Sequence, residues 1–241
     1  MSERVQKFLA NHGIASRREI ERLIKAGEVQ IDGKACILGQ RISGDENVVI
    51  SGNRLRLNLA VKERALLYHK PCGEIVSKHD PEDRPTVFEN LPKLSSGRWI
   101  SIGRLDVNTS GLLLFTTVGN LANKLMHPSS NVEREYQVRV HGKVTNEMLS
   151  NLQQGVELED GIAKFEILEV QAGKGTNSWF RVVLKEGRNR EIRRLWESQG
   201  LQVSRLLRTR YGSIILPKDL KRGSYRELSS NKIKQLYRVL E

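Results

Sequence analysis

The sequence predicts an α+β protein of two domains, a small N-terminal domain over residues 1–60 and a larger domain over residues 61–241. Two observations predict this division. Two short helical patterns followed by short strand patterns end near Ala60, and a new apolar strand pattern begins with Ala65-Leu66-Leu67-Tyr68. A total of 241 residues is enough for one or two domains whose cores need no disulfide or metal support.

The net charge predicts a polyanionic partner. Lysine and arginine total 40 against 28 acidic residues, which gives a formal net charge of +12, and only 5% of the residues are aromatic. No basic amphipathic helix stands out as a membrane-surface element, so a nucleic acid is the favoured partner. A generally basic protein without such a partner would show the same balance of charge.

Cysteine usage and the N-terminal composition predict a cytoplasmic protein. Cys36 and Cys72 are far apart and form no Cys-x-x-Cys pair, and the five histidines are scattered, so neither a disulfide framework nor a metal site is expected. The N-terminus is polar, and no apolar run approaches membrane-spanning length. We therefore expect neither secretion nor membrane insertion.

The first 60 residues show the pattern helix, turn, basic helix and short strands. Val5, Phe8 and Leu9 lie at helical spacing, and a second helix is expected to be capped by Ser16 with Glu19 as its capping-box partner. Strands are expected at 29–31, 48–50 and 55–59, with Asp32-Gly33 as a turn after the first of them. The outward face of the second helix carries four cations, Arg17, Arg18, Arg22 and Lys25.

This arrangement, with the sequence Gly-x-Val-x-Ile-Asp-Gly at residues 27–33, resembles the S4 RNA-binding domain. The resemblance implies that the four cations of the second helix meet RNA phosphates, through an attraction that is independent of RNA sequence and sensitive to salt. A charged helix face that is only solvated is the alternative.

Asp106 is the candidate catalytic residue of the larger domain. It stands in a polar stretch, residues 103–111, that runs directly into the apolar residues 112–115. A carboxylate between an arginine and a polar turn, just ahead of a short apolar run, is typical of an active-site loop that feeds a buried strand. The alternative is that Asp106 and Asn108 only form an Asx-type turn.

Two later segments carry further candidates. Residues 133–140 alternate as a half-buried strand that places Tyr136 on its apolar face. Residues 186–196 begin as a glycine turn and become a helix whose first turns carry Arg188, Arg190, Arg193 and Arg194. Because cations oppose the macrodipole at a helix N-terminus, these arginines predict an anionic partner. Further strands are expected at 163–170, 179–184 and 204–211, and further helices at 121–126, 144–152 and 233–240.

Three segments together resemble the core motifs of pseudouridine synthases. They are Gly-Arg-Leu-Asp-x-Asn-Thr-Ser-Gly-Leu-Leu-Leu-Phe-Thr, the Glu-x-Glu-Tyr strand, and Gly-Arg-Asn-Arg-Glu-Ile-Arg-Arg. With the S4-like domain in front, the whole chain is similar to one group of ribosomal RNA pseudouridine synthases. This group contains the A type, which acts on the small subunit, and the B and F types, which act on the large subunit. The chain resembles the B type most. The resemblance implies a catalytic domain with a mixed, mainly antiparallel sheet flanked by helices.

The same resemblance implies a function. It is the site-specific isomerisation of uridine to pseudouridine in ribosomal RNA, with a stem-loop of 23S large-subunit rRNA favoured over 16S rRNA. Asp106 would be the catalytic carboxylate, acting on the sugar or the base of a flipped-out nucleotide while the N1 to C1′ bond breaks and the base rejoins through C5. No cofactor and no metal would be required, and we expect a monomer.

The resemblance also assigns roles to other residues. Arg193 matches the arginine that pairs with the catalytic aspartate and favours its ionised form. Tyr136 matches the tyrosine that stacks on the target base, although its alternation pattern describes an ordinary core residue equally well. Arg104 matches the arginine that follows the RNA backbone or fills the space left by the flipped nucleotide. Ile192 would pack under the base, and Arg190 belongs to the same RNA-binding segment.

Two departures and two alternatives complete these expectations. Val118 stands where relatives commonly carry aspartate, so a turn contact is expected to be lost without effect on Asp106. Some relatives carry a basic C-terminal tail, and since this sequence ends at Glu241 a tail contribution is expected to be absent. The main alternative to a pseudouridine synthase is a non-catalytic RNA-binding or ribosome-assembly factor that contains an S4 domain. A metal-dependent ribonuclease would need clustered carboxylates, which the Asp106 motif lacks.

Overall fold

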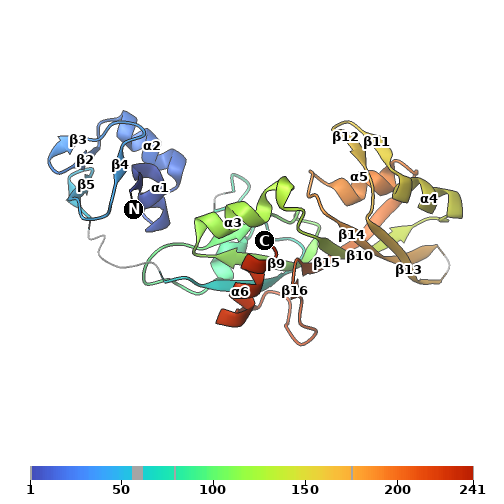
Figure 1. Ribbon diagram of the computed structural model, residues 1–241. Helices are drawn as coiled ribbons and strands as arrows, with labels where there is room; N and C mark the ends of the chain where they lie inside the picture. Colours follow the sequence, from blue (N-terminus) through green and yellow to red (C-terminus); the bar gives the residue numbers. More distant parts are fainter. Residues whose placement is uncertain (1, 56–61, 79, 175, 241) are drawn as a thin grey trace. The chain divides into compact units, whose positions relative to one another are not determined.

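The computed structural model describes residues 2–55, 62–78, 80–174 and 176–240, apart from the side chains of 173 and 174, and it divides the chain into two compact units (Figure 1). The first unit combines residues 1–64 with Pro92–Ile100 and Thr117–Gly119. The second combines Ala65–Leu91, Ser101–Thr116 and Asn120–Glu241. The expected domain boundary at 60/61, and residues 56–59 of the expected strand at 55–59, lie outside the described residues.

The first unit packs two helices against short strands. Its four-stranded sheet has the order β3-β2-β5-β6, and β1 pairs with β4. The elements are β1 (Glu3–Arg4), α1 (Val5–Asn11), α2 (Arg17–Lys25), β2 (Val29–Ile31), β3 (Lys34–Ala35), β4 (Arg41–Ile42), β5 (Val48–Ile50) and β6 (Asn53–Arg54). The expected turn is confirmed, because Asp32 and Gly33 connect β2 and β3 with φ angles of 50° and 77°, values that aspartate and glycine tolerate.

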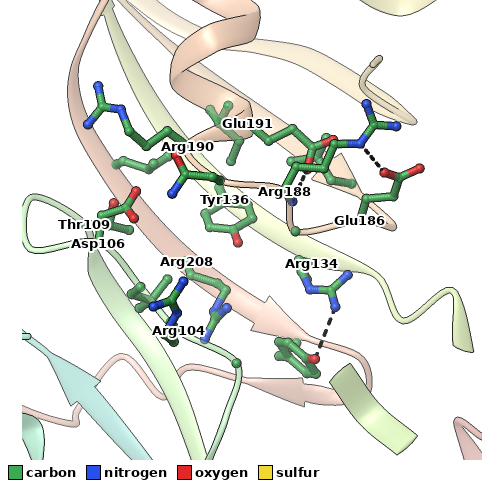
Figure 2. A pocket seen from close by; sticks show the side chains of 18 of the residues that line it. Arg104, Asp106, Thr109, Arg134, Tyr136, Glu186, Arg188, Arg190, Glu191 and Arg208 are labelled. Atoms are coloured by element: carbon green, nitrogen blue, oxygen red, sulfur yellow. Dashed lines mark hydrogen bonds and ion pairs between the residues drawn. The ribbon is translucent and has the colours of Figure 1, made fainter. Parts of the chain in front are cut away.

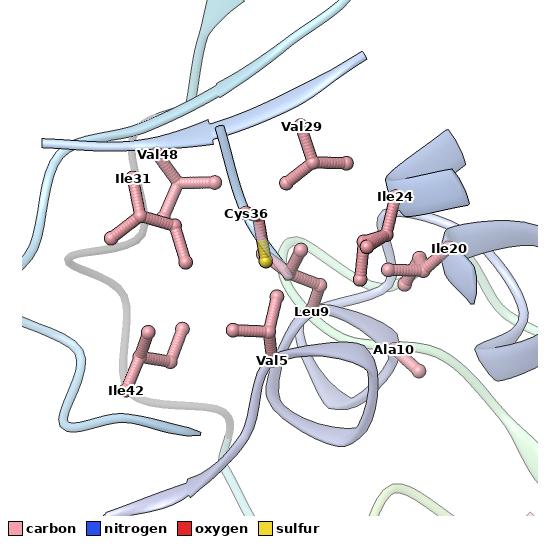
Figure 3. Packing of buried hydrophobic residues seen from close by; sticks show 10 residues of the cluster. All are labelled: Val5, Leu9, Ala10, Ile20, Ile24, Val29, Ile31, Cys36, Ile42 and Val48. Carbon is pink, nitrogen blue, oxygen red and sulfur yellow. The ribbon is translucent and has the colours of Figure 1, made fainter. Parts of the chain in front are cut away.

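The core of this unit joins both helices to the sheet. Val5 and Leu9 of α1 and Ile20 of α2 are fully buried among apolar side chains from the strands (Figure 3). Ser16 caps α2 as expected, since its Oγ accepts a hydrogen bond of 3.1 Å from the Glu19 amide. The Glu19 carboxylate bonds Arg22, an oppositely charged side chain one turn away, instead of closing a capping box. Packing therefore buries the apolar stripe and leaves the charged face of α2 outside.

The second unit contains a nine-stranded mixed sheet whose main path has the order β13-β14-β10-β15-β9-β7-β17. The β15–β9 pair is parallel, whereas the other pairs along this path and the β15–β16 pair are antiparallel. The expected α+β class and the mainly antiparallel sheet are confirmed. The strands are β7 (Ala65–Lys70), β8 (Ile100–Ile102), β9 (Ser110–Thr116), β10 (Arg134–His141), β13 (Ile167–Lys174), β14 (Asn177–Leu184), β15 (Gln202–Tyr211), β16 (Ile214–Ile215) and β17 (Tyr225–Glu227).

Helices and a small hairpin accompany this sheet. They are η1 (Val87–Asn90), α3 (Gly119–Met126), η2 (Pro128–Ser130), α4 (Asn146–Gln154), the hairpin β11 (Val156–Leu158) and β12 (Gly161–Ala163), α5 (Glu191–Glu197) and α6 (Ser230–Arg238). Helix α5 packs against β15 and β11, and α4 packs against β13. The strand expected at 163–170 is two strands, because residues 161–163 pair with β11 before the chain enters the large sheet. No helix in the described parts of the chain is long and apolar enough to cross a bilayer.

Candidate active site

A pocket of about 670 Å³ lies within the second unit, between the Asp106 loop, β10, β15 and the start of α5 (Figure 2). Its volume is within the range of about 300–1,000 Å³ that is usual for small-ligand sites. The structure brings together in its lining all six residues that the sequence predicts for a site in the larger domain, Arg104, Asp106, Tyr136, Arg190, Ile192 and Arg193. Predicted residues from three separate segments therefore converge on one cavity.

Asp106 presents a free carboxylate on a fixed backbone. Its carbonyl oxygen accepts hydrogen bonds of 3.0 Å from the Thr109 amide and 3.1 Å from Lys70 Nζ. Among the described residues, no hydrogen bond or ion pair occupies the Asp106 carboxylate, which is half-buried at the pocket. The loop is thus a main-chain turn in which the side chain forms no Asx bond, and the carboxylate is available to a ligand.

Lys70 bonds the main chain of this loop, and no pattern in the sequence predicts this role. The side chain is 0% exposed, and its Nζ donates to the carbonyl oxygens of Pro71, Asp106 and Thr109 at 3.0, 3.1 and 3.0 Å. Burial lowers the pKa of the Lys70 ammonium to about 8, against the pull of nearby Cys72, Glu74 and Asp106. A buried cation thereby ties the end of β7 to both ends of the Asp106 turn.

Gly111 allows β15 to approach the loop closely. It pairs with Arg208 across the parallel β9–β15 ladder and has a φ of +112°. A Cβ at this position would lie 2.3 Å from the Arg208 carbonyl oxygen, so only glycine fits. This contact fixes where Arg208 enters the pocket.

Arg193 is 9% exposed and reaches the Asp106 loop through its main chain. Its two Nη atoms donate at 2.9 Å to the carbonyl oxygens of Val203 and Asn108, and its Nε has no partner among the described residues. No ion pair within 4.0 Å joins it to Asp106 in the part of the chain that the structure describes. Burial and nearby Arg190 lower the pKa of Arg193, while Asp106 raises it. The expected direct pairing with the carboxylate stays a prediction.

The family and the fold of the chain follow from comparisons with known proteins. A family model described as RNA pseudouridylate synthase matches residues 64–198, and an S4 domain model matches residues 3–48. The chain belongs to the RNA pseudouridylate synthase family. The expected S4-like domain and the resemblance to pseudouridine synthases are thereby confirmed, and the chain is an isomerase of this family.

Curated relatives of this synthase extend over its whole length. Proteins named "Ribosomal large subunit pseudouridine synthase B" are 55% identical over 244 residues in Vibrio cholerae, covering 100% of this chain and 76% of the relative, and 53% identical over 250 residues in Escherichia coli K12, covering 100% and 84%. A solved structure titled "Crystal structure of pseudouridylate synthase" aligns with a TM-score of 0.67 at 25% identity and covers 97% of this chain and 99% of that one. The resemblance to the B type is confirmed.

Tyr136 lies at the centre of the synthase pocket. It is 8% exposed, comes from the buried face of β10 and has Val182 and Arg208 as its cross-strand partners. In Figure 2 its ring stands between Asp106 and Arg188 with the hydroxyl directed toward Arg208 and Arg134. It is therefore both a strand residue with buried neighbours and an aromatic surface of the pocket.

The arginines at the start of α5 have different surroundings. Arg188 bonds Glu186 and lies 3.7 Å from Asp160, and Arg194 bonds Asp160 at 2.7 Å, so both of these cations have anionic partners within the chain. Arg190 is exposed and lies 3.5 Å from Glu197. Buried Glu191 accepts from the Arg188 amide, and burial raises the pKa of its carboxyl.

Besides Lys70, sequence reasoning missed Arg134, Arg208 and Tyr211, which line the pocket. Arg134 and Arg208 are 7% and 2% exposed, and both guanidinium groups stack on the ring of buried Tyr211, at 5.2 and 5.1 Å from its centroid. No pattern in the sequence separates these two arginines from the many others in strands. Their burial is visible only in the folded sheet.

In the S4 domain, the four predicted RNA-binding cations are all exposed on α2. Arg22 is paired with Glu19 at 2.5 Å, whereas no ion pair compensates Arg17, Arg18 or Lys25 among the described residues.

The turn after β9 contains Val118, where an aspartate was expected in relatives. In this turn the Thr117 hydroxyl accepts a hydrogen bond of 3.0 Å from the Arg64 amide and donates one of 2.8 Å to the Lys62 carbonyl. The described residues contain no group of three or more His, Cys, Asp or Glu that could hold a metal ion.

Proposed function

We propose that this synthase isomerises one uridine to pseudouridine in a stem-loop of 23S large-subunit ribosomal RNA, with Asp106 as the catalytic carboxylate. The observation that carries the proposal is the unoccupied Asp106 carboxylate at a pocket lined by an aromatic ring and several arginines. The relatives named as large-subunit synthases support the large subunit over 16S rRNA. We further propose that the protein acts as a monomer in the cytoplasm.

The chemistry follows from what the pocket offers. A uridine inside a stem hides its glycosidic carbon, so the nucleotide flips into the pocket before reaction. The Asp106 carboxylate then acts at the sugar or the base while the N1 to C1′ bond breaks. The freed base rotates, C5 bonds C1′, C5 loses its proton and N1 gains one, so that no atom is lost overall.

Neighbouring residues hold the two reacting parts. Tyr136 offers its ring for stacking on the base, with Ile192 of α5 packing beneath it. Arg193 keeps the loop in place, because its guanidinium donates a hydrogen bond to the Asn108 carbonyl two residues after Asp106. Arg104 is exposed at the pocket rim, where it contacts the RNA backbone or the gap left by the flipped base.

RNA delivery is assigned to the S4 domain and to Arg190. Arg17, Arg18 and Lys25 on α2, which have no ion-pair partner among the described residues, form an exposed basic face with Arg22 beside them. Each phosphate contact releases counterions, so the binding constant depends steeply on salt. Changing Arg18 and Lys25 to glutamine should weaken RNA binding and reduce the slope of log K against log salt by up to about 2. An unchanged slope would contradict a role for α2.

The decisive experiment maps pseudouridine across ribosomal RNA from a deletion strain complemented with wild type or with Asp106→Asn. We expect one large-subunit pseudouridine to be absent in the deletion, restored by the wild type and not restored by Asp106→Asn. The matched control is Asp83→Asn, an exposed residue at a φ of 51° that both side chains tolerate. Restoration by Asp106→Asn would refute its catalytic role, and a missing pseudouridine in 16S rRNA would refute the choice of the large ribosomal RNA.

A further inference from the structure

The strongest unexplained feature of the pocket is a buried cation without an anion. Arg208 is 2% exposed, its Nε donates to the Leu112 carbonyl at 2.7 Å, and its Nη2 has no hydrogen-bond partner among the described residues. No carboxylate lies within 4.0 Å of it in the same part of the chain. Because a buried charge is costly unless it is paired, this arrangement calls for an anion that arrives with the substrate.

The sheet aims this cation into the pocket. Arg208 and Tyr211 are three residues apart on β15, so regular alternation would place them on opposite faces. An irregularity in the β10–β15 register lies between them, and it brings both side chains to the same face. The guanidinium then stacks on the Tyr211 ring, and Arg134 stacks on the same ring, also without a carboxylate partner in the described residues.

The position of Arg208 relates it to the reacting nucleotide. It is the cross-strand partner of Tyr136 on β10 and of Gly111 on β9, five residues after Asp106. Figure 2 shows Arg104, Arg208 and Arg134 on the side of the pocket toward which the Tyr136 hydroxyl points. Arg104 is exposed and has no ion-pair partner among the described residues. A uridine stacked on Tyr136 would bring its own backbone next to these cations.

We propose that Arg208, supported by Arg104 and Arg134, binds one of the two backbone phosphates that adjoin the target uridine. This inference rests on the proposed function and names the part of the substrate that these three arginines recognise. A phosphodiester carries a single negative charge, which would compensate the buried positive charge of the guanidinium. Its oxygens can accept hydrogen bonds from the planar fork of arginine donors. The uracil carbonyls are neutral and would leave the buried charge uncompensated.

The test neutralises one phosphate at a time. The probe is a synthetic stem-loop of large-subunit rRNA around the mapped uridine, carrying a single methylphosphonate on its 5′ or its 3′ side. For the wild type we expect one of the two substitutions to raise Kd by about ten- to a hundredfold, the value of a lost charge-assisted hydrogen bond. With Arg208→Gln the same substitution should have no further effect, because its partner is already absent.

Controls separate this contact from general charge and from misfolding. Arg188→Gln removes a pocket arginine already paired with Glu186, so the methylphosphonate effect should persist in full. Should Arg208→Gln not fold, the exposed Arg104→Gln replaces it, with the methylphosphonate effect expected to shrink at the same position. Wild-type binding that is indifferent to both neutral phosphates would overturn the proposal, and so would an effect that survives in Arg208→Gln and in Arg104→Gln.

Turnover is measured in parallel on the unmodified stem-loop. The phosphate contact is measured as the effect of the methylphosphonate on Kd and its loss in Arg208→Gln, so it is independent of pseudouridine formation. If this effect is present but no pseudouridine forms, the phosphate contact stands and the proposed reaction is refuted. If pseudouridine forms but the effect is absent, the reaction stands and the contact is refuted.

Discussion

Replacing Lys70 by methionine should loosen the Asp106 turn. Methionine keeps the length and flexibility of the lysine stem but cannot donate a hydrogen bond. The Asp106 carbonyl would keep its bond from the Thr109 amide, whereas the carbonyls of Pro71 and Thr109 would lose the Nζ donor. Each buried acceptor left without a donor costs about 1–3 kcal/mol, and the removed burial penalty of the ammonium offsets part of this loss. We expect a net loss of about 2–4 kcal/mol in the free energy of unfolding.

Urea denaturation measures this loss, and single-turnover pseudouridine formation measures its consequence for Asp106. If Asp106 acts as proposed, we expect kcat to fall at least about tenfold, since small displacements of a reacting group are costly, while Kd for RNA changes little. Lys143→Met, at an exposed lysine, is the matched control and should stay within about 0.5 kcal/mol of the wild type. A Lys70→Met protein with wild-type stability and wild-type kcat would refute the reasoning.

The same lysine predicts a pH dependence. Its pKa is about 8 in the folded protein and 10.5 in a solvated chain, so between these values the unfolded state binds more protons. Folding stability from this group therefore rises with pH through that window, by up to about 1.4 kcal/mol per pH unit. The difference in unfolding free energy between wild type and Lys70→Met should grow from pH 8 to pH 10. A constant difference would show that the ammonium is not desolvated.

Three further substitutions test the frame of the site. Gly111→Ala places a Cβ 2.3 Å from the Arg208 carbonyl oxygen and should cost at least about 3 kcal/mol in urea unfolding, whereas Gly187→Ala meets nothing nearer than 3.5 Å and should stay within about 1 kcal/mol. Arg193→Lys keeps the charge but cannot span two carbonyls, so kcat should fall at least about tenfold in single-turnover assays with little change in Kd. Ser16→Ala removes the α2 cap and should cost about 1 kcal/mol by thermal unfolding.

Features that depend on neighbours in the chain were predictable. The Ser16 cap, the Asp32-Gly33 turn and the alternation that buries Tyr136 each arise within a few residues, and the structure shows all three. The buried strand after Asp106 was equally predictable, because seven successive residues of β9 are buried and most are apolar. The convergence of the candidate residues on one pocket came from the family resemblance, since residues 104–106, 136 and 190–193 are distant in sequence.

Features that depend on distant neighbours were not predictable. One local feature was not predictable either, because Glu19 looked like a capping-box partner but its carboxylate bonds Arg22, three residues later on the same helix. Arg188 and Arg194 looked like cations awaiting an external anion, and the hairpin residue Asp160 supplies one to both. No periodicity distinguishes Arg208 from the exposed arginines around it, since an irregularity in strand pairing sets its direction.

By itself, the sequence determined the two kinds of domain, the positions of the main helices and strands and the basic charge, and it indicated Asp106 as the candidate catalytic residue. Only the tertiary structure decided that Lys70 bonds the main chain of the Asp106 turn and that Arg208 lies buried in the pocket with no carboxylate partner among the described residues. The physical reason is that helix periodicity, caps and turns are short-range. Whether a charge is buried, and what then compensates it, depends on segments that meet only when the sheet has formed.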